Sequence, residues 1–511
     1  MKHRPFPTVL RRPAAWLLAG ALLGTHPARP QAPNLLATTC YLTGERTLGG
    51  EPPRRPAAPA PTPLTVGQPV KGTVANNEAQ PYAFQLAAGQ VAQVVVDQQG
   101  VDVVVTALTP DGQPLAEVDN PNDSHGLEIV WLHATAAGRY RVAVRALEKN
   151  SPGTYQITLE TVRAATPADA QRLRAQQLMA EGQQLRGSLS LRSSSAAERQ
   201  AAADKFAAAY AIWHALKDGR EADLAMLSLG ITSANAALVA AKLPSSTNKM
   251  TVYYSPGFEA RALAMRARLE PALAFFSAKL NVSPTINLAV LNQTDWQLPN
   301  RQFQVPYGTP YSVPSLVVLP ATLEFDQQVA AALKGGLTAP QMRALEAAGG
   351  PIEQQVQAYF EDIAYHEMGH LYEYFYGVNA PTHWINEFLA SYLMLAYLDE
   401  KEPARAKNMQ RMSEAFVQAT RPEHTSLADF ERFYIGLSPM NYGWYQNQFA
   451  LRVATVYSTE KLGLMGKMKA AFPFAPGPRL APADVLRRVD QLSPGFAAWE
   501  QQLTPAAATT K

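Results

Sequence analysis

The pattern of hydrophobic and polar positions divides the chain into three parts. In residues 64–162, short runs of β-branched and aromatic residues alternate with polar residues at a period of two, and turn dipeptides such as Asp111-Gly112 separate the runs. This pattern predicts an antiparallel β-sandwich. The expected strands cover residues 81–86, 93–96, 101–106, 138–144 and 153–159.

Residues 163–248 follow a helical pattern, because Ala, Gln and Leu dominate and apolar positions recur at helical spacing. The run from Ala203 through Phe206 to Trp213 resembles part of a tetratricopeptide array, of which only about one and a half repeats are visible. A solenoid that is stable alone needs about three repeats. We therefore expect a helical connector that packs on its neighbours, with a peptide-binding groove as the alternative.

Residues 249–503 mix both patterns, with strand-like runs at 251–254, 285–291 and 315–319 and a helical run through Leu269. Helical periodicity dominates from residue 341 onward. These patterns predict a mostly helical α+β domain. The expected fold class is therefore multidomain, with an all-β sandwich, an α-helical repeat-like connector and an α+β domain in that order.

The two ends of the chain have patterns of their own. In residues 1–32, basic residues precede an apolar run and small residues follow it, which is the order of a secretory signal. The apolar run is about eleven residues long, well short of the roughly twenty that span a bilayer. Residues 33–63 are a Pro- and Ala-rich linker, and residues 504–511 are a tail. We expect a secreted or periplasmic bacterial protein without a membrane span.

Composition narrows the possible chemistry. The chain has 45 Lys and Arg against 42 Asp and Glu, so its net charge is only +3 and no strong field attracts nucleic acid. The single cysteine, Cys40, excludes an intramolecular disulfide, cysteine-rich zinc modules and iron–sulfur clusters. Any metal ion must therefore be held by carboxylates and by some of the nine histidines.

The run predicted to form a helix at residues 351–376 contains the motif His366-Glu367-Met-Gly-His370. Residues four apart lie on one helix face, so the two imidazoles can converge on one ion. Glu367 lies beside that face and can reach a metal-bound water, which makes it the candidate general base. Gly377 and Pro381 are expected to end the helix.

A second helix is expected to begin near Thr382 and to carry Glu387, the natural third ligand. Two imidazoles and one carboxylate leave one position of a tetrahedral Zn²⁺ open, as in catalytic rather than structural sites. We therefore expect one zinc ion per chain, held by His366, His370 and Glu387.

The run Trp384-Ile-Asn-Glu-Phe-Leu-Ala-Ser-Tyr392 matches W-x-N-E-x-x-A-x-Y, and with the first motif it resembles the gluzincin metallopeptidases of the aminopeptidase-like branch. The resemblance covers about residues 250–503 and implies a thermolysin-like catalytic domain in which Glu367 is the base. The Gly-x-Met-x-Asn motif that binds the substrate amine in aminopeptidases is missing, so aminopeptidase activity is not implied. Residues 315–319 occupy the expected place of the edge strand that pairs with substrate.

The same resemblance implies a tyrosine that stabilises the oxyanion, several dozen residues after the third ligand. We expect Tyr445 or Tyr442 in this role, with Tyr434 and His424 as less favoured choices. Two further residues have open roles. His383 is either a substrate contact or a loop histidine, and Asp362 either orients a ligand or is an acid on the helix surface.

Residues 64–162 resemble the pre-peptidase C-terminal domain, a small sandwich attached to many secreted bacterial peptidases. The resemblance rests on Tyr82-x-Phe84, the Gly89 turn, Asp111-Gly112, Gly138-x-Tyr140 and Gly153-x-Tyr155. It implies an accessory domain, which is either a spacer or a contact with substrate or a surface.

Together, these features predict a secreted zinc metallopeptidase that hydrolyses peptide or protein substrates. Two alternatives remain open. One is a secreted binding protein whose metallopeptidase-like domain is catalytically silent, and the other is a metallohydrolase of non-peptide amides or esters.

Overall fold

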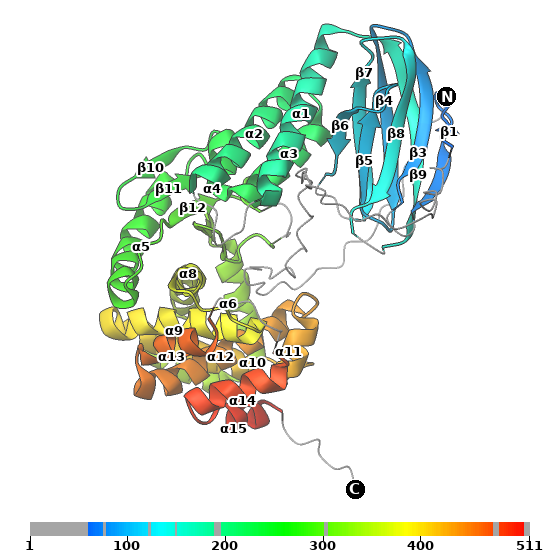
Figure 1. Ribbon diagram of the computed structural model, residues 1–511. Coiled ribbons are helices and arrows are strands. Elements are labelled where there is room, and N and C mark those ends of the chain that lie inside the picture. Colours follow the sequence, from blue (N-terminus) through cyan, green and yellow to red (C-terminus); the bar gives the residue numbers. More distant parts are fainter. Residues whose placement is uncertain are drawn as a thin grey trace, which may run out of the picture. The chain divides into compact units, whose positions relative to one another are not determined.

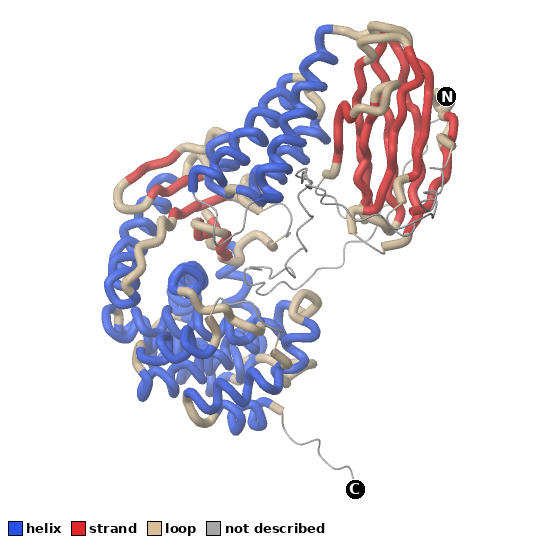
Figure 2. Tube along the Cα trace, viewed as in Figure 1, coloured by secondary structure: helices blue, strands red, loops and turns tan. Residues whose placement is uncertain are grey.

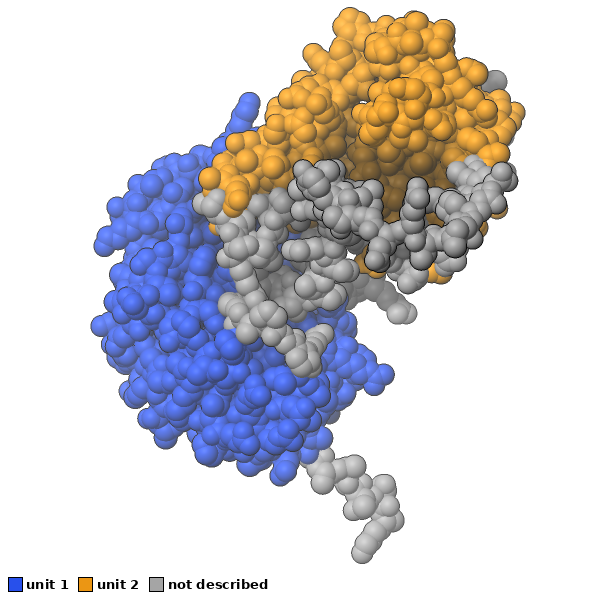
Figure 3. Space-filling view, in the orientation of Figure 1, with its two compact units in different colours: residues 1–23, 234–511 blue, residues 24–233 orange. Residues whose placement is uncertain are grey.

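The computed structural model describes residues 60–74, 78–120, 124–148, 151–188, 196–300, 305–473 and 480–504. The predicted signal, Cys40, nearly all of the linker and residues 505–511 lie outside these ranges. The chain divides into two compact units, one that ends at Ser233 and one that begins at Ala234 (Figure 3). Among the described residues, no helix is both long enough and apolar enough to cross a membrane.

The first unit begins with two β-sheets that share one hydrophobic core, so the predicted sandwich is confirmed (Figures 1 and 2). One sheet has the order β1-β3-β8-β5-β6 and the other β2-β9-β4-β7. Neighbours are antiparallel except for the short β1, which pairs with β3 in parallel. The strands are β1 (Thr62–Pro63), β2 (Val70–Val74), β3 (Gln80–Leu86), β4 (Gln90–Gln99), β5 (Val103–Leu108), β6 (Pro114–Val118), β7 (His125–His133), β8 (Gly138–Ala146) and β9 (Gly153–Ala164).

All five predicted runs lie within or overlap strands, and the sequence pattern missed β1, β2, β6 and β7. Alternation places the inward side chains of both sheets in one core, where the hydroxyls of Tyr82 and Tyr155 lie 2.8 Å apart. Gly72 makes room for this pair, since a Cβ there would lie 2.4 Å from the Tyr155 ring. The paired tyrosines therefore leave room only for glycine at position 72 of β2.

Three helices follow in the same unit, namely α1 (Pro167–Ser188), α2 (Ala196–Ala215) and α3 (Gly219–Thr232), so the helical character predicted after the sandwich is confirmed as far as Thr232. Residues 234–248, the last part of the predicted segment, belong to the second unit and include a strand at Ser245–Thr247. Helix α1 packs along the free edge of β7, the last strand of its sheet. Its Gln176 side chain accepts from Trp131 N at 2.7 Å and donates to Trp131 O at 3.1 Å. The amide thus satisfies backbone groups that an edge strand would otherwise leave unpaired.

Asp169, in the first turn of α1, fixes the junction between β9 and the helix. Its buried carboxylate accepts two bonds from Arg163 at 2.6 and 2.8 Å, one from Thr166 N at 2.7 Å and one from Arg172 at 3.0 Å. The Arg163 bonds hold the pKa of Asp169 well below its usual range, although burial opposes them. The position near the helix N-terminus also favours a negative charge.

The second unit contains a five-stranded mixed sheet with the order β10-β11-β12-β14-β13. Here the sequence interpretation needs a correction, because residues 315–319 fall in β14, which is an inner strand between β12 and β13. The edge strands are β10 and β13, and the pattern revealed neither because each is only three residues long. The strands are β10 (Ser245–Thr247), β11 (Thr251–Tyr254), β12 (Asn287–Leu291), β13 (Tyr311–Val313) and β14 (Leu316–Pro320).

Helices make up the rest of this unit and enclose its largest hydrophobic core (Figure 1). The two helices predicted to carry the ligands are α8 and α9, and they pack directly on each other. The helices are α4 (Ala234–Ala240), α5 (Glu259–Leu280), α6 (Glu324–Gly336), α7 (Ala339–Gly349), α8 (Ile352–Tyr376), α9 (His383–Lys401), α10 (Pro403–Ala419), α11 (Leu427–Phe433), α12 (Pro439–Glu460), α13 (Gly463–Ala471), α14 (Pro482–Leu492) and α15 (Phe496–Leu503).

We predict that Asp169→Asn destabilises the first unit by about 2 to 3 kcal/mol at pH 7, because charged hydrogen bonds to a buried carboxylate are lost. The folded-state pKa of Asp169 is lowered, so its stabilisation is present above the ordinary value of 3.8 and is lost as the pH falls below it. Urea unfolding of the full chain, followed by pulsed hydrogen exchange in β9 and α1, measures the difference.

The matched control is Asp204→Asn, because Asp204 is an exposed acid on α2 that bonds only Gln200 among the described residues. A pH-independent difference between wild type and Asp169→Asn would contradict the assignment.

Candidate metal centre

Helix α8 runs for 25 residues and ends at Gly377, whose φ of 97° is the left-handed conformation that closes a helix. Tyr359, Phe360, Leu371 and Tyr372 are buried and seat the helix in the core, as their helical spacing predicts. The motif residues His366, Glu367 and His370 are themselves at most 4% exposed. Helix α8 therefore carries its polar motif into the interior of the unit.

The three expected ligands come together in the structure. Candidate ligand atoms of His366, His370 and Glu387 all lie within 4.8 Å of one another. Glu387 Oε2 lies 3.2 Å from His366 Nε2 and 3.6 Å from His370 Nε2. Ligands at zinc bond lengths of about 2.0–2.1 Å and tetrahedral angles stand roughly 3.3 Å apart, so the two distances fit one ion.

The hydrogen bonding of the group also fits a cation. His370 is buried, and neither of its ring nitrogens has a hydrogen-bond partner among the described residues. His366 Nδ1 lies 3.1 Å from Ser391 Oγ, and its other ring nitrogen, Nε2, lies 3.2 Å from Glu387 Oε2. Buried polar nitrogens normally have partners, so this group could bind a metal ion.

Electrostatics at the centre favour a positive charge. Burial by itself raises the pKa of Glu387, but the nearby charge of His370 and the bond from His366 hold it well below its ordinary range. Burial lowers the pKa of His366, and the bond to Glu387 only partly opposes it. Burial also disfavours charge on His370, yet the Glu387 carboxylate raises its pKa to about 9. Glu387 therefore presents a carboxylate to a place where a cation is stabilised.

Glu367 points toward an edge strand of the sheet. Ser312 Oγ of β13 donates to Glu367 Oε2 at 3.0 Å. Burial raises the pKa of the Glu367 carboxyl to about 8, against the opposing charge of His370. The residue next to the first histidine thus contacts β13 while both imidazoles face Glu387.

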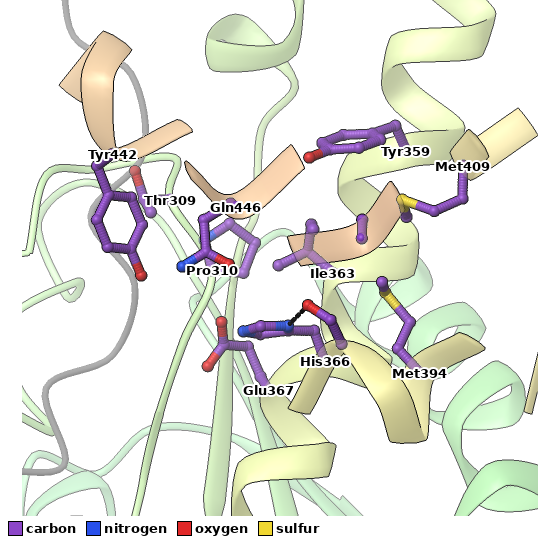
Figure 4. A pocket seen from close by; sticks show the side chains of 12 residues that line it. Thr309, Pro310, Tyr359, Ile363, His366, Glu367, Met394, Met409, Tyr442 and Gln446 are labelled. Atoms are coloured by element: carbon purple, nitrogen blue, oxygen red, sulfur yellow. Dashed lines mark hydrogen bonds between the residues drawn. The ribbon is translucent and has the colours of Figure 1, made fainter. Parts of the chain in front are cut away.

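A pocket opens beside His366 and Glu367 (Figure 4). Gln446 and Tyr442, four residues apart on α12, face it, and apolar side chains form much of the remaining wall. The wall consists of Thr309, Pro310, Tyr359, Ile363, Ser391, Met394, Met409 and Ala450.

The candidate tyrosines occupy three different positions. Tyr442 lines the pocket, and its buried hydroxyl has no hydrogen-bond partner of normal geometry among the described residues. Tyr445 is fully buried and its hydroxyl donates to Ser426 O at 2.8 Å, outside the set that lines the pocket. Tyr434 donates to Glu387 Oε1 at 2.6 Å, and burial raises its pKa well above 10, so the hydroxyl keeps its proton.

Gln446 and Ser312 were missed by sequence reasoning. Gln446 Nε2 donates to Glu387 Oε2 at 2.9 Å, although 59 residues separate the two in the chain. No local spacing signals such a contact. For Gln446, the only signal is its position one helical turn after Tyr442.

The open roles of Asp362 and His383 are settled differently from the sequence expectation. Asp362 is fully buried rather than a surface acid, and it bonds Arg268 of α5 at 2.5 Å and Arg405 of α10 at 2.8 Å. It therefore ties α8 to two neighbouring helices. His383 Nδ1 bonds Glu431 Oε2 at 3.1 Å, and its ring stacks on Tyr434.

Gly369, inside the motif, permits the close approach of α8 and α9. A Cβ at this position would lie 2.7 Å from Ala390 O and 3.0 Å from Ala390 Cα. Ala390 follows Glu387 by three residues on α9. The missing side chain therefore sets the distance between the helix with two imidazoles and the helix with the carboxylate.

Comparison with known proteins gives no family. No protein-family model and no curated protein matches the chain. Among solved structures, the pre-peptidase C-terminal domain of a Bacillus anthracis collagenase matches with 16% identity and a TM-score of 0.17, over 20% of this chain and 95% of that one.

Two further structures match over 20% of this chain with 16% identity and a TM-score of 0.15. The periplasmic g-type lysozyme inhibitor PliG of Aeromonas hydrophila is covered over 100% of its chain. The CspB protease of Clostridium perfringens is covered over 29%. The functional proposal therefore depends on the residues of the chain itself.

We predict that Gly369→Ala forces α9 away from α8, destabilises the second unit by about 1 to 3 kcal/mol and weakens metal binding at least about tenfold. Gly466→Ala is the control, because Gly466 is an exposed glycine inside α13 whose nearest foreign atom is 3.9 Å from the built Cβ. Thermal unfolding and chelator competition measure the two effects. Equal behaviour of the two variants would contradict the steric role of Gly369.

Proposed function

We propose that the protein is a zinc-dependent metallopeptidase in which His366, His370 and Glu387 hold the ion and Glu367 is the general base. The observation that carries the proposal is the convergence of these three ligands beside a buried carboxylate and a pocket, all within the second unit. Two imidazoles and one carboxylate leave room for a further ligand, as catalytic zinc sites require.

A bound Zn²⁺ supplies Lewis acidity, which polarises a carbonyl and lowers the pKa of water at the site. Glu367 lies next to His366 and at the pocket wall, so its carboxylate is placed to accept a proton and pass it to a leaving amine. Ser312 holds this carboxylate from the opposite side through its 3.0 Å bond. Glu367 is thus proposed to act both as the general base and as the general acid, in an orientation that Ser312 holds.

Tyr442 is the best-placed donor for an oxyanion that forms in the pocket. Its hydroxyl lies at the pocket wall and is not engaged in a normal hydrogen bond within the described residues. The Tyr434 hydroxyl is its neighbour, and a donor that already lies at the pocket wall needs little reorganisation when charge develops there. Tyr445, the other sequence candidate, already donates to Ser426 O.

The wider setting is part of the same proposal. Residues 1–32 support export, so the protein acts in the periplasm or outside the cell on peptides or proteins. The sandwich of the first unit is proposed to contact substrate or a surface rather than to join the chemistry, since the three ligands belong to the other unit.

We predict that Glu367→Gln binds one zinc ion per chain, like the wild type, but does not cleave peptides. The substitution keeps the shape of the side chain and removes only its ability to take a proton. Metal content by mass spectrometry and cleavage of a denatured-protein library test both parts. The fragments also distinguish peptide-bond cleavage from the hydrolysis of other amides.

Metal content decides between failures of this proposal. Absence of bound zinc from wild type would disprove the centre, whereas equal cleavage by both proteins would disprove the role of Glu367. Zinc in both proteins without any cleavage would favour the alternative of a catalytically silent binding protein.

We predict that Tyr442→Phe lowers kcat about 100- to 1000-fold with little change in KM, because one oxyanion donor is lost. Tyr445→Phe removes a hydroxyl bond to Ser426 O and is expected to affect mainly stability. Steady-state kinetics on one peptide substrate compare the two. A larger loss of kcat in Tyr445→Phe would reverse the assignment.

A further inference from the structure

Helix α11 and the residue after it contact the third-ligand helix at two points. Although α11 has only seven residues, Phe430 is fully buried and packs against Tyr434, Tyr445 and Phe449. At its start, Ser426 caps the helix by accepting from Asp429 N at 3.0 Å. The short helix is therefore anchored in the core, although it has little intrinsic stability of its own.

Glu431 of α11 caps the N-terminus of α9. The helix begins after Thr382, whose side chain makes no capping bond. Glu431 Oε1 accepts from Trp384 N at 2.8 Å, and Oε2 accepts from His383 N and His383 Nδ1, both at 3.1 Å. A carboxylate from another helix thus satisfies the first backbone donors and complements the positive end of α9.

Tyr434, directly after α11, holds the third ligand itself. Its hydroxyl donates to Glu387 Oε1 at 2.6 Å, and its ring stacks on His383 with centroids 4.0 Å apart and an interplanar angle of 17°. Glu387 Oε2 is the oxygen that faces both imidazoles. A bond to one carboxylate oxygen restricts rotation of the whole group, so it also directs the other oxygen.

The two contacts act on one helix, the first at His383 and Trp384 and the second one turn later at Glu387. Glu431 fixes where α9 begins, and Tyr434 fixes the carboxylate that α9 carries at Glu387. The His383 ring connects them, since it bonds the first and stacks on the second. Position and rotation of the ligand are therefore set by the same short segment.

We propose that Glu431 and Tyr434 are positioning residues that hold Glu387 in the geometry that binds the metal ion. The inference depends on the proposed zinc centre. It assigns a role in metal binding to α11 and Tyr434, which lie outside both ligand motifs. Neither residue touches the reacting atoms in this role, because each acts through Glu387 or the helix that carries it. Partners of metal ligands in this position contribute about 10- to 100-fold in metal affinity.

The test measures zinc affinity by chelator competition on the full-length chain for wild type, Tyr434→Phe and Glu431→Gln. The control is Tyr392→Phe, because Tyr392 is a fully buried tyrosine on the same helix whose hydroxyl donates to Lys461 O instead. We expect zinc affinity to fall about 10- to 100-fold in Tyr434→Phe and Glu431→Gln and less than about threefold in Tyr392→Phe. Thermal unfolding is recorded in parallel with excess chelator.

A merely structural role would lower the unfolding temperature in all three variants and leave the affinity of the folded protein unchanged. That result, or an equal loss of affinity in Tyr392→Phe, would overturn the inference. If Tyr434→Phe does not fold, Glu431→Gln alone decides, since it keeps the size of the side chain. Absence of zinc binding from wild type would instead disprove the proposed centre itself.

Discussion

The contact between Gly369 and Ala390 is the constraint on which the second unit depends. Two helices approach closely enough for imidazoles on one and a carboxylate on the other to meet only where no side chain separates them, and a Cβ at Gly369 would lie 2.7 Å from a backbone oxygen. The sheet, the aromatic core around α8 and the cap of α9 all help to hold these two helices against each other. The glycine of the motif is thus a packing residue, whereas its neighbours in the motif supply chemistry.

Close packing places His366, Glu367, His370 and Glu387 in the interior, beside further buried acids such as Glu373, and burying such groups is costly unless they are compensated. The structure satisfies Glu387 with Tyr434 on one oxygen and Gln446 and His366 on the other. Glu367 accepts from Ser312, while both ring nitrogens of His370 lack a hydrogen-bond partner among the described residues. A cation held by His366, His370 and Glu387, as proposed, would balance the buried carboxylate and give the free ring nitrogens a partner. In that proposal the metal ion contributes to stability as well as to the reaction.

The sequence reveals what depends on local spacing. Two histidines four apart and the cap at Gly377 follow from helical geometry, and Glu387 was found because it belongs to a second recognisable motif. Helices α8 and α9 begin and end within one residue of expectation where their limits were predicted. Contacts between distant segments have no such period. Tyr434, Gln446 and Glu431 reach α9 from 47, 59 and 47 residues away. The edge strand was misplaced for the same reason, since strand order is set by pairing and not by the pattern of one run.

The ion pairs of Asp362, which hold α8 in place, lie one helical turn before His366 and Glu367, which are proposed to act on substrate. The two groups of charges do not share a contact. Arg268 and Arg405 both form ion pairs with Asp362, and Glu361 and Glu402 lie within 3.6 Å of them. These carboxylates balance the positive charge of the two arginines, so the arginines exert little net field at His366. Beyond His366 the pocket wall is formed largely by Ile363, Met394 and Met409. Such a wall excludes water and strengthens every electrostatic interaction beside it. The network therefore fixes the helix, and the two motif residues that line the pocket, His366 and Glu367, face apolar side chains there.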